Sequence, residues 1–227
     1  MTAQLELEAI AADVADCRAC PRLVSWREQV AAEKRASFRD ETYWGRGVPA
    51  FGDPAARLVV VGLAPAAHGA NRTGRMFTGD RSGDWLYRAM HRAGFANQAE
   101  SSSLSDGLIL TDALVTSPVK CAPPANKPTT IERDTCRPFL DRELEVVDAK
   151  AFVALGGFAY QALCSYFEVR PRPKFGHGVE VAVTDRHGAE ATIIGSYHVS
   201  QQNTFTGRLT EEMLDSVFAR ARQIVEI

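Results

Sequence analysis

The chain lacks any apolar run that approaches the roughly 20 residues needed by a membrane-spanning helix. It also lacks the signs of a secretory leader, because the segment Met1–Glu6 contains neither a basic stretch nor an apolar one. Internal repeats and low-complexity tracts are absent as well. We therefore expect a cytoplasmic protein with no membrane partner.

The chain also lacks a strong excess of charge of either sign. The net charge is −2, which argues against a generally basic nucleic-acid-binding protein. The charges are unevenly distributed, however. Residues 65–81 carry three arginines and a single acid, Asp80, and residues 191–210 carry no acid, only His198 and Arg208. A neutral protein with a locally basic face can still bind phosphates, so nucleic acid remains open as a partner.

With 227 residues, 45% of them hydrophobic, the chain can bury one core, and we expect a single domain over 1–227. Short apolar segments alternate with helical ones, which is typical of a parallel sheet covered on both faces. Thr129 is the expected N-cap of the helix that is predicted over 130–147. Strands are predicted over 57–62, 108–114, 151–156 and 191–196, with a hairpin or edge strand over 179–184. Helices are predicted over 5–15, 24–38, 84–93, 130–147, 158–167 and 209–224.

Three long segments follow the predicted strands. They are residues 62–80, 116–127 and 197–208. In parallel sheets covered by helices, ligands bind beyond the carboxyl ends of the strands. The three segments leave from that edge, so we expect them to converge on one site.

Four of the five cysteines form two clusters, Cys17 with Cys20 and Cys121 with Cys136. In a cytosolic protein, a Cys-x-x-Cys pair indicates a metal or redox site more often than a disulfide. Zinc and a [4Fe–4S] cluster both accept four cysteines, and the spacing does not choose between them. The alternative is that all four are buried apolar thiols. Cys164 lies in an apolar helical segment and is expected in the core.

The first and last of the three segments carry side chains suited to binding a ligand. Phe77 can stack on a flat ring, and the carboxylate of Asp80 can face a positive charge or hold a water molecule. His198 opens a polar segment that contains Phe205, which either fills a gap or joins the core. A flexible surface loop is the alternative for 62–80, since Gly, Asn and Thr favour loops.

At this point the chain resembles a known family. Residues 62–80 read Gly-Leu-Ala-Pro-Ala-Ala-His-Gly-Ala-Asn-Arg-Thr-Gly-Arg-Met-Phe-Thr-Gly-Asp, and residues 198–210 read His-Val-Ser-Gln-Gln-Asn-Thr-Phe-Thr-Gly-Arg-Leu-Thr. Both motifs, together with 120–128 and the four clustered cysteines, resemble the family 5 (type b) uracil-DNA glycosylases. The resemblance spans nearly the whole chain. It implies a three-layer α/β/α sandwich around a four-stranded parallel twisted sheet, and a [4Fe–4S] cluster.

The resemblance also implies an activity. Such a monofunctional enzyme flips a damaged nucleotide out of DNA and hydrolyses its N-glycosidic bond, leaving an abasic site. Its implied substrates are uracil and other deaminated bases, such as hypoxanthine and xanthine. The expected partner is DNA that contains such bases, and we expect a monomer.

Roles for single residues follow from the same resemblance. Asp80 would stabilise the sugar cation or position water, His198 would donate to a uracil carbonyl oxygen, and Asn203 would hold the water or the abasic sugar. Substrate contacts are expected from Phe77, Asn126, Gly62, Ala64 and His68. DNA contacts are expected from Arg72, Arg75, Arg208, Gln201 and Gln202. The cluster ligands would be Cys17, Cys20, Cys121 and Cys136.

One residue departs from the pattern of the best-known uracil glycosylases. They carry an aspartate two residues after the glycine that closes the first strand, and Ala64 stands there in this chain. Ala64 and Ala113 leave room compatible with larger bases. The main alternative function is a non-catalytic nucleic-acid-binding module held together by zinc or an iron–sulfur cluster. A redox protein is a third hypothesis, but the chain has no evident second redox centre.

Overall fold

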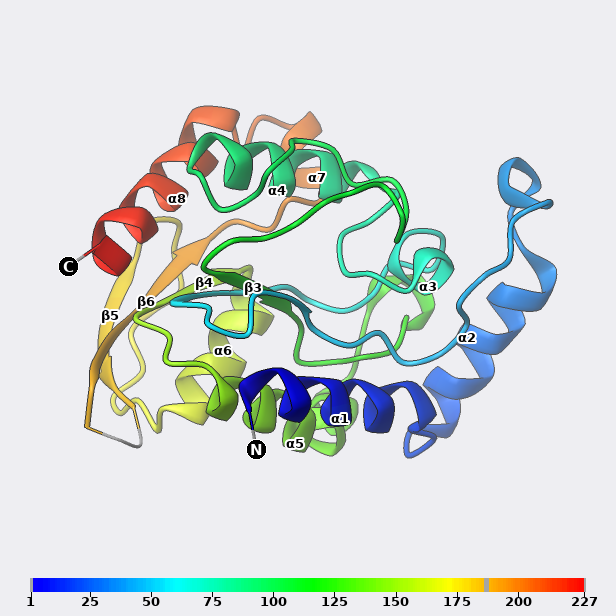
Figure 1. The fold of residues 1–227 in the computed structure, drawn as a ribbon, viewed down its shortest axis with the longest axis horizontal. Helices are drawn as coiled ribbons and strands as arrows, with labels where there is room; N and C mark the ends of the chain where they lie inside the picture. The colour runs from blue at the N-terminus through cyan, green and yellow to red at the C-terminus, as the bar shows by residue number, and fades with distance from the viewer. Residues whose placement is uncertain (1, 186–187, 227) are drawn as a thin grey trace.

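The computed structural model describes residues 2–185 and 188–226 and has three layers, with a sheet between two sets of helices (Figure 1). Within these residues the sheet has six strands in the order β1-β3-β2-β4-β6-β5. The four inner strands are parallel, and β1 and β5 are antiparallel to their neighbours. The strands are β1 (Phe51–Gly52), β2 (Leu58–Val61), β3 (Ala113–Thr116), β4 (Ala151–Leu155), β5 (Glu180–Thr184) and β6 (Glu190–Ser196).

The two central strands, β2 and β4, are apolar and buried at every position because both faces of the sheet are covered. Side chains alternate between the faces along a strand. On β2, Leu58 and Val60 join an apolar cluster with α4 (Arg81–Arg92) and α8 (Glu211–Glu226). Val59 and Val61 face the opposite way, toward α5 (Thr130–Val146) and α6 (Gly157–Tyr166). Figure 1 shows these two helix pairs on opposite sides of the sheet, with α1 (Ala3–Asp16) packed along α5.

Three of the four predicted core strands and the predicted edge strand are confirmed, but the sheet is mixed and has six strands, and the four parallel strands expected form only its inner part. Residues 39–56, for which no helix or strand is predicted, contribute β1, whose Gly52 pairs closely with β3. A Cβ atom at Gly52 would lie 2.2 Å from the carbonyl oxygen of Ala113, so only glycine permits this pairing. The strand predicted over 108–114 begins only at Ala113, because Asp112 has a positive φ of 59°.

The observed ends of the helices agree with the sequence prediction at some positions and differ from it at others. Thr129 caps α5 as predicted and forms a capping box with Glu132. Helix α2 (Pro21–Glu33) ends earlier than predicted, at Lys34 with a φ of 55°, and a short 3₁₀ turn, η1 (Ala36–Phe38), follows. The remaining short elements are α3 (Ala70–Thr73), η2 (Pro124–Asn126) and α7 (Gln201–Phe205).

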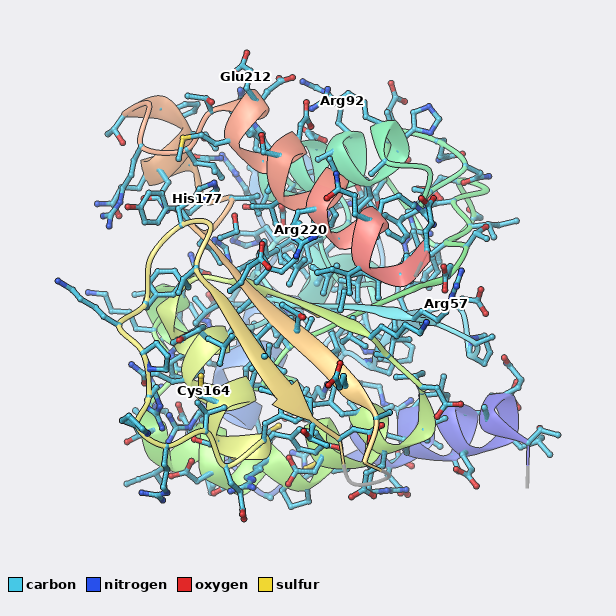
Figure 2. The ribbon with its side chains drawn as sticks, turned by 90° about the vertical axis from the view of Figure 1, so that its left-hand side faces the viewer. Arg57, Arg92, Cys164, His177, Glu212 and Arg220 are labelled. Atoms are coloured by element: carbon cyan, nitrogen blue, oxygen red, sulfur yellow. The ribbon has the colours of Figure 1, made fainter. Side chains whose placement is uncertain are left out.

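Figure 2 shows the side of the molecule at the β5 edge. Arg220 of α8 donates to Glu180 of β5 at 2.8 Å, and Arg92 of α4 donates to Asp215 of α8 at 2.7 Å. Cys164 lies on α6 and is buried, in agreement with the prediction that it belongs to the core. In the described part of the chain, no helix is both long enough and apolar enough to cross a membrane.

Candidate active site

A cavity of about 980 Å³ opens beyond the carboxyl ends of the inner strands. Its size is at the upper end of the range for small-molecule sites. Residues that follow β2, β4 and β6 line it, together with 125–127 from the segment after β3. The predicted convergence of 62–80, 116–127 and 197–208 is therefore confirmed.

Phe77 provides an aromatic wall of this cavity. Its backbone φ is 51°, an uncommon value for a bulky residue, so the surrounding fold must hold it there. The ring lies against Gly62, where a Cβ atom would stand 2.7 Å from the ring carbons. Gly62 does not line the cavity; it makes room for Phe77 instead.

Asp80 is the N-cap of α4 and lines the cavity. Its Oδ1 accepts hydrogen bonds from the backbone N–H groups of Ser82 at 2.9 Å and Gly83 at 3.1 Å. Its Oδ2 faces Gly69, where a Cβ atom would stand only 2.0 Å away. Burial raises the pKa of the Asp80 carboxyl above its usual range, against the opposing effect of the two backbone donors. One oxygen is thus fixed by the helix while the carboxyl group stays at the cavity wall.

His198 lies across from Phe77, with 6.2 Å between the ring centroids. Burial lowers the pKa of His198 to about 4, so the imidazole is neutral at neutral pH. A neutral imidazole carries one N–H donor and one acceptor nitrogen. Within residues 2–185 and 188–226, the ring forms no hydrogen bond, which leaves this donor for a ligand.

Two neighbours hold the backbone around His198. Asn203 does not line the cavity; its Nδ2 donates to the His198 carbonyl oxygen at 2.9 Å. In the structure this contact holds the backbone at His198, and the water-holding role expected of Asn203 stays a prediction. On the other side, the Tyr197 N–H donates to Nδ1 of His177 at 3.2 Å. No sequence motif marked His177 for this role.

Two arginines expected to bind DNA are buried instead. Arg72 donates to the His68 carbonyl oxygen at 2.8 Å and pairs with Glu41. Arg75 is 3% exposed in its side chain and pairs with Asp106 at 2.6 Å. Neither guanidinium group is available to a phosphate, so the expectation for both residues is corrected. Through these buried hydrogen bonds and ion pairs, the two arginines stabilise the conformation of residues 62–80.

Most of the other residues predicted to contact substrate or DNA line the cavity. Ala64, His68 and Asn126 line the cavity. His68 shares a hydrogen bond of 3.0 Å between its Nδ1 and the Tyr43 hydroxyl. Gln201 and Gln202 line the cavity as well and are exposed, whereas Arg208 is exposed but does not line it and lies over the Tyr197 ring. Further lining residues that sequence reasoning missed are Arg35, Phe38, Arg81, Lys127 and Phe158.

The four clustered cysteines line a second, much smaller cavity. All four are free, two of them buried. Cys17 and Cys20 lie between α1 and α2, whereas Cys121 follows β3 and Cys136 lies within α5. No group of three or more His, Cys, Asp or Glu side chains in the described ranges is arranged to hold a single metal ion. The two cysteine pairs thus meet at one cavity, and their predicted role as ligands of a shared metal group stays a prediction.

Fold and site together define an α/β protein that receives a ligand at the carboxyl edge of its sheet. The family model for the uracil DNA glycosylase superfamily matches residues 49–222. A type-5 uracil-DNA glycosylase from Mycobacterium tuberculosis is 55% identical over 215 residues, covering 93% of this chain and 79% of that protein. One from Thermus thermophilus is 46% identical over 223 residues, covering 97% and 99%. A type-4 enzyme from Archaeoglobus fulgidus is 30% identical over 152 residues, covering 66% and 69%. The chain belongs to the uracil DNA glycosylase superfamily and, within it, to the type-5 uracil-DNA glycosylases.

The buried pair Arg75–Asp106 generates a first prediction. Arg75→Met leaves a mostly buried carboxylate without its cation, so the free energy of unfolding should fall by about 3 kcal/mol in a urea titration. Arg81→Met, at an exposed arginine of the same region, is the matched control and should unfold like the wild type. Equal stability of the two variants would contradict the interior role of Arg75.

Proposed function

We propose that the protein excises uracil from DNA by hydrolysing the N-glycosidic bond and leaving an abasic site. The observation that carries this proposal is the meeting of the Phe77 ring, the Asp80 carboxyl and the neutral His198 imidazole in one cavity. The names of the type-5 relatives support the same activity.

The bond to be broken is unreachable inside a stacked duplex, so the nucleotide must be flipped into the protein. The cavity beyond the sheet has the volume to receive a base. Phe77 offers a face on which the flipped ring stacks. Asn126, on the opposite loop, is exposed and lines the same cavity, where its amide can contact the edge of the base.

Cleavage leaves positive charge on the sugar and negative charge on the departing base, so the site needs an anion beside one and a donor beside the other. Asp80 supplies the anion, and its fixed orientation on α4 means that no reorganisation is needed at the moment of reaction. His198 supplies the donor to a base oxygen as a neutral imidazole. The N-glycosidic bond breaks with its electron pair going to the base. The water oxygen then bonds to the sugar carbon, and the proton that the water loses is taken up by the departing base anion.

Asp80 must also handle the water. Ala64 stands where other uracil glycosylases place an aspartate, and it lines the cavity without a polar group. Among the described residues that line this cavity, Asp80 is the only carboxylate. One side chain therefore stabilises the sugar cation and orients the attacking water.

The substrate range includes hypoxanthine and xanthine in this proposal. The wall after β2 is built from Ala64, Ala66 and Ala67, whose side chains are small. A bicyclic base needs more room than uracil, and the cavity of about 980 Å³ is large enough to enclose one.

The rival function, a non-catalytic nucleic-acid-binding module, fits the site less well. A carboxylate in the wall of the binding cavity repels the phosphates that such a module must attract. Burial also raises the pKa of Asp80, and perturbed carboxyl groups of this kind are concentrated at catalytic sites.

DNA would be held by cations around the cavity mouth. Arg35, Arg81 and Lys127 line the cavity, and Arg208 is exposed nearby over the Tyr197 ring. None of the four pairs with a carboxylate within the described ranges, so each is free to contact a phosphate. Phe205 is 66% exposed and lies beside Arg81, so it does not belong to the core. The other expectation for Phe205, that it fills a gap when DNA is bound, stays open.

We propose that Cys17, Cys20, Cys121 and Cys136 hold a [4Fe–4S] cluster. They line one cavity, which supports a shared ligand set. A zinc ion needs four sulfurs about 2.3 Å from one point, and the cysteines do not form a group that fits a single ion. When bound, the [4Fe–4S] cluster supplies a structural tie between the α1–α2 region and the segment that carries Asn126.

Asp80→Asn tests the proposed chemistry directly. Duplexes with one uracil or one hypoxanthine should be cleaved after alkali by the wild type, and the single-turnover rate should fall by roughly 10²-fold or more in the variant. Asp84→Asn, an exposed acid on the same helix, is the matched control and should retain the rate. Tight DNA binding by a wild type that cleaves neither duplex would favour the binding-module alternative.

The pH dependence tests the charge state of the site. Because burial keeps His198 neutral down to a pKa of about 4, the rate should show no inflection near 6.5, the usual histidine value. Protonation of Asp80, whose pKa is raised, should cause a single loss of rate as the pH falls. Single-turnover rates from pH 4 to 9 measure this. An inflection near 6.5 that disappears in His198→Asn would contradict it.

Salt dependence tests the phosphate contacts. Arg35→Ala and Lys127→Ala should each reduce the slope of log K against log salt by about 1 on an undamaged duplex, because each removes one phosphate contact. Arg18→Ala is the control, since Arg18 is exposed, pairs with Glu28 and does not line the cavity. Unchanged slopes for both mouth variants would remove these residues from the interface.

A further inference from the structure

Arg27 of α2 is a buried cation with an unusual set of partners. It is 1% exposed, yet it forms no ion pair with a carboxylate in the described ranges. Its Nη1 donates to the Cys121 sulfur at 2.8 Å and its Nη2 to the Cys17 carbonyl oxygen at 2.9 Å. Its Nε is buried and has no partner.

A buried charge without a counter-charge is costly. Lys120, a second buried cation that lines the cysteine cavity, pairs with Glu143 at 2.5 Å. Arg27 instead donates to the sulfur of Cys121 and to the backbone of Cys17, two of the four clustered cysteines. Cysteines that hold a metal centre do so as thiolates, so the guanidinium would lie directly beside the negative charge of such a centre.

The same arginine is connected to the active site through its backbone. Nδ2 of the fully buried Asn71 donates to the Arg27 carbonyl oxygen at 3.2 Å. The Asn71 N–H donates to the carbonyl oxygen of Ala66 at 3.0 Å. The loop that begins at Ala66 leads to Gly69, which touches Asp80. A continuous set of contacts thus runs from the cysteine cavity to the catalytic carboxylate.

We infer that Arg27 is a positioning residue with two functions. Its guanidinium is the counter-charge of the four-cysteine centre, and its backbone contact with Asn71 keeps the loop from Ala66 to Gly69 in place against Asp80. Loss of the centre then loosens the active site at a distance. This inference rests on the proposed function and on the proposed cluster.

The test compares Arg27→Gln, which loses the charge, with Arg27→Lys, which keeps it, in anaerobically purified full-length protein. Iron release to a chelator should accelerate roughly ten- to a hundredfold in Arg27→Gln, the usual effect of removing a partner next to a metal ligand. The reduction potential should become more negative, since a positive charge near the cluster is lost. Arg27→Lys should restore the potential. Arg18→Gln, an exposed neighbour, should match the wild type.

A separate variant tests the proposed coupling between Arg27 and the active site. Asn71→Ala should retain iron like the wild type but show faster hydrogen exchange over residues 66–71 and a lower kcat on uracil DNA. If Arg27→Gln fails to fold, Asn71→Ala still tests the coupling to the active site. A comparison of iron release and reduction potential between Arg27→Lys and Cys121→Ser then still tests the role of the positive charge at the four-cysteine centre.

Three outcomes would overturn the inference. They are a wild type without iron, an unchanged potential and iron release in Arg27→Gln, or unchanged exchange and kcat in Asn71→Ala. A wild type that holds iron and responds to Arg27→Gln, but cleaves no uracil DNA, would refute the proposed function alone and leave the counter-charge role standing.

Discussion

The close contact between Gly69 and the Asp80 carboxyl is the constraint on which the active site depends. It requires the segment after β2 to fold back on itself until a backbone atom touches the carboxyl group. Two buried arginines make that fold possible, Arg72 through carbonyl groups of the segment and Arg75 through Asp106. The Asp80 carboxyl is therefore placed by interior contacts, and two of the arginines that suggest DNA binding in the sequence serve to shape the loop.

The sheet and the site differ in how far the sequence reveals them. Strands such as Leu58–Val61 were evident because burial on both faces demands an unbroken apolar run. The two residues of β1 were not, because so short an edge strand depends on Gly52 meeting β3 rather than on any local pattern. The positions of Asp80 and His198 followed from the topology of a parallel sheet. The burial of Arg72 and Arg75 could not be predicted, since their partners Glu41 and Asp106 lie far away in the chain.

Two centres share one framework in this molecule. Ala64 lines the large cavity and also packs against the apolar cluster formed by Leu23, Val119 and Cys121. Phe158 does the same from the loop after β4. The wall of the substrate cavity and the wall of the cysteine region are thus partly the same residues. A change in the packing of Ala64 or Phe158 therefore alters the walls of both regions.

The separation of the cysteine pairs along the chain also sets an order of events during synthesis. Arg27 and Cys121 are 94 residues apart. At ribosomal rates this interval lasts roughly 5–20 s, during which α1 and α2 have emerged without Cys121. The contact between α2 and the middle of the chain therefore closes only after the segments that form β1, β2 and β3 have been synthesised.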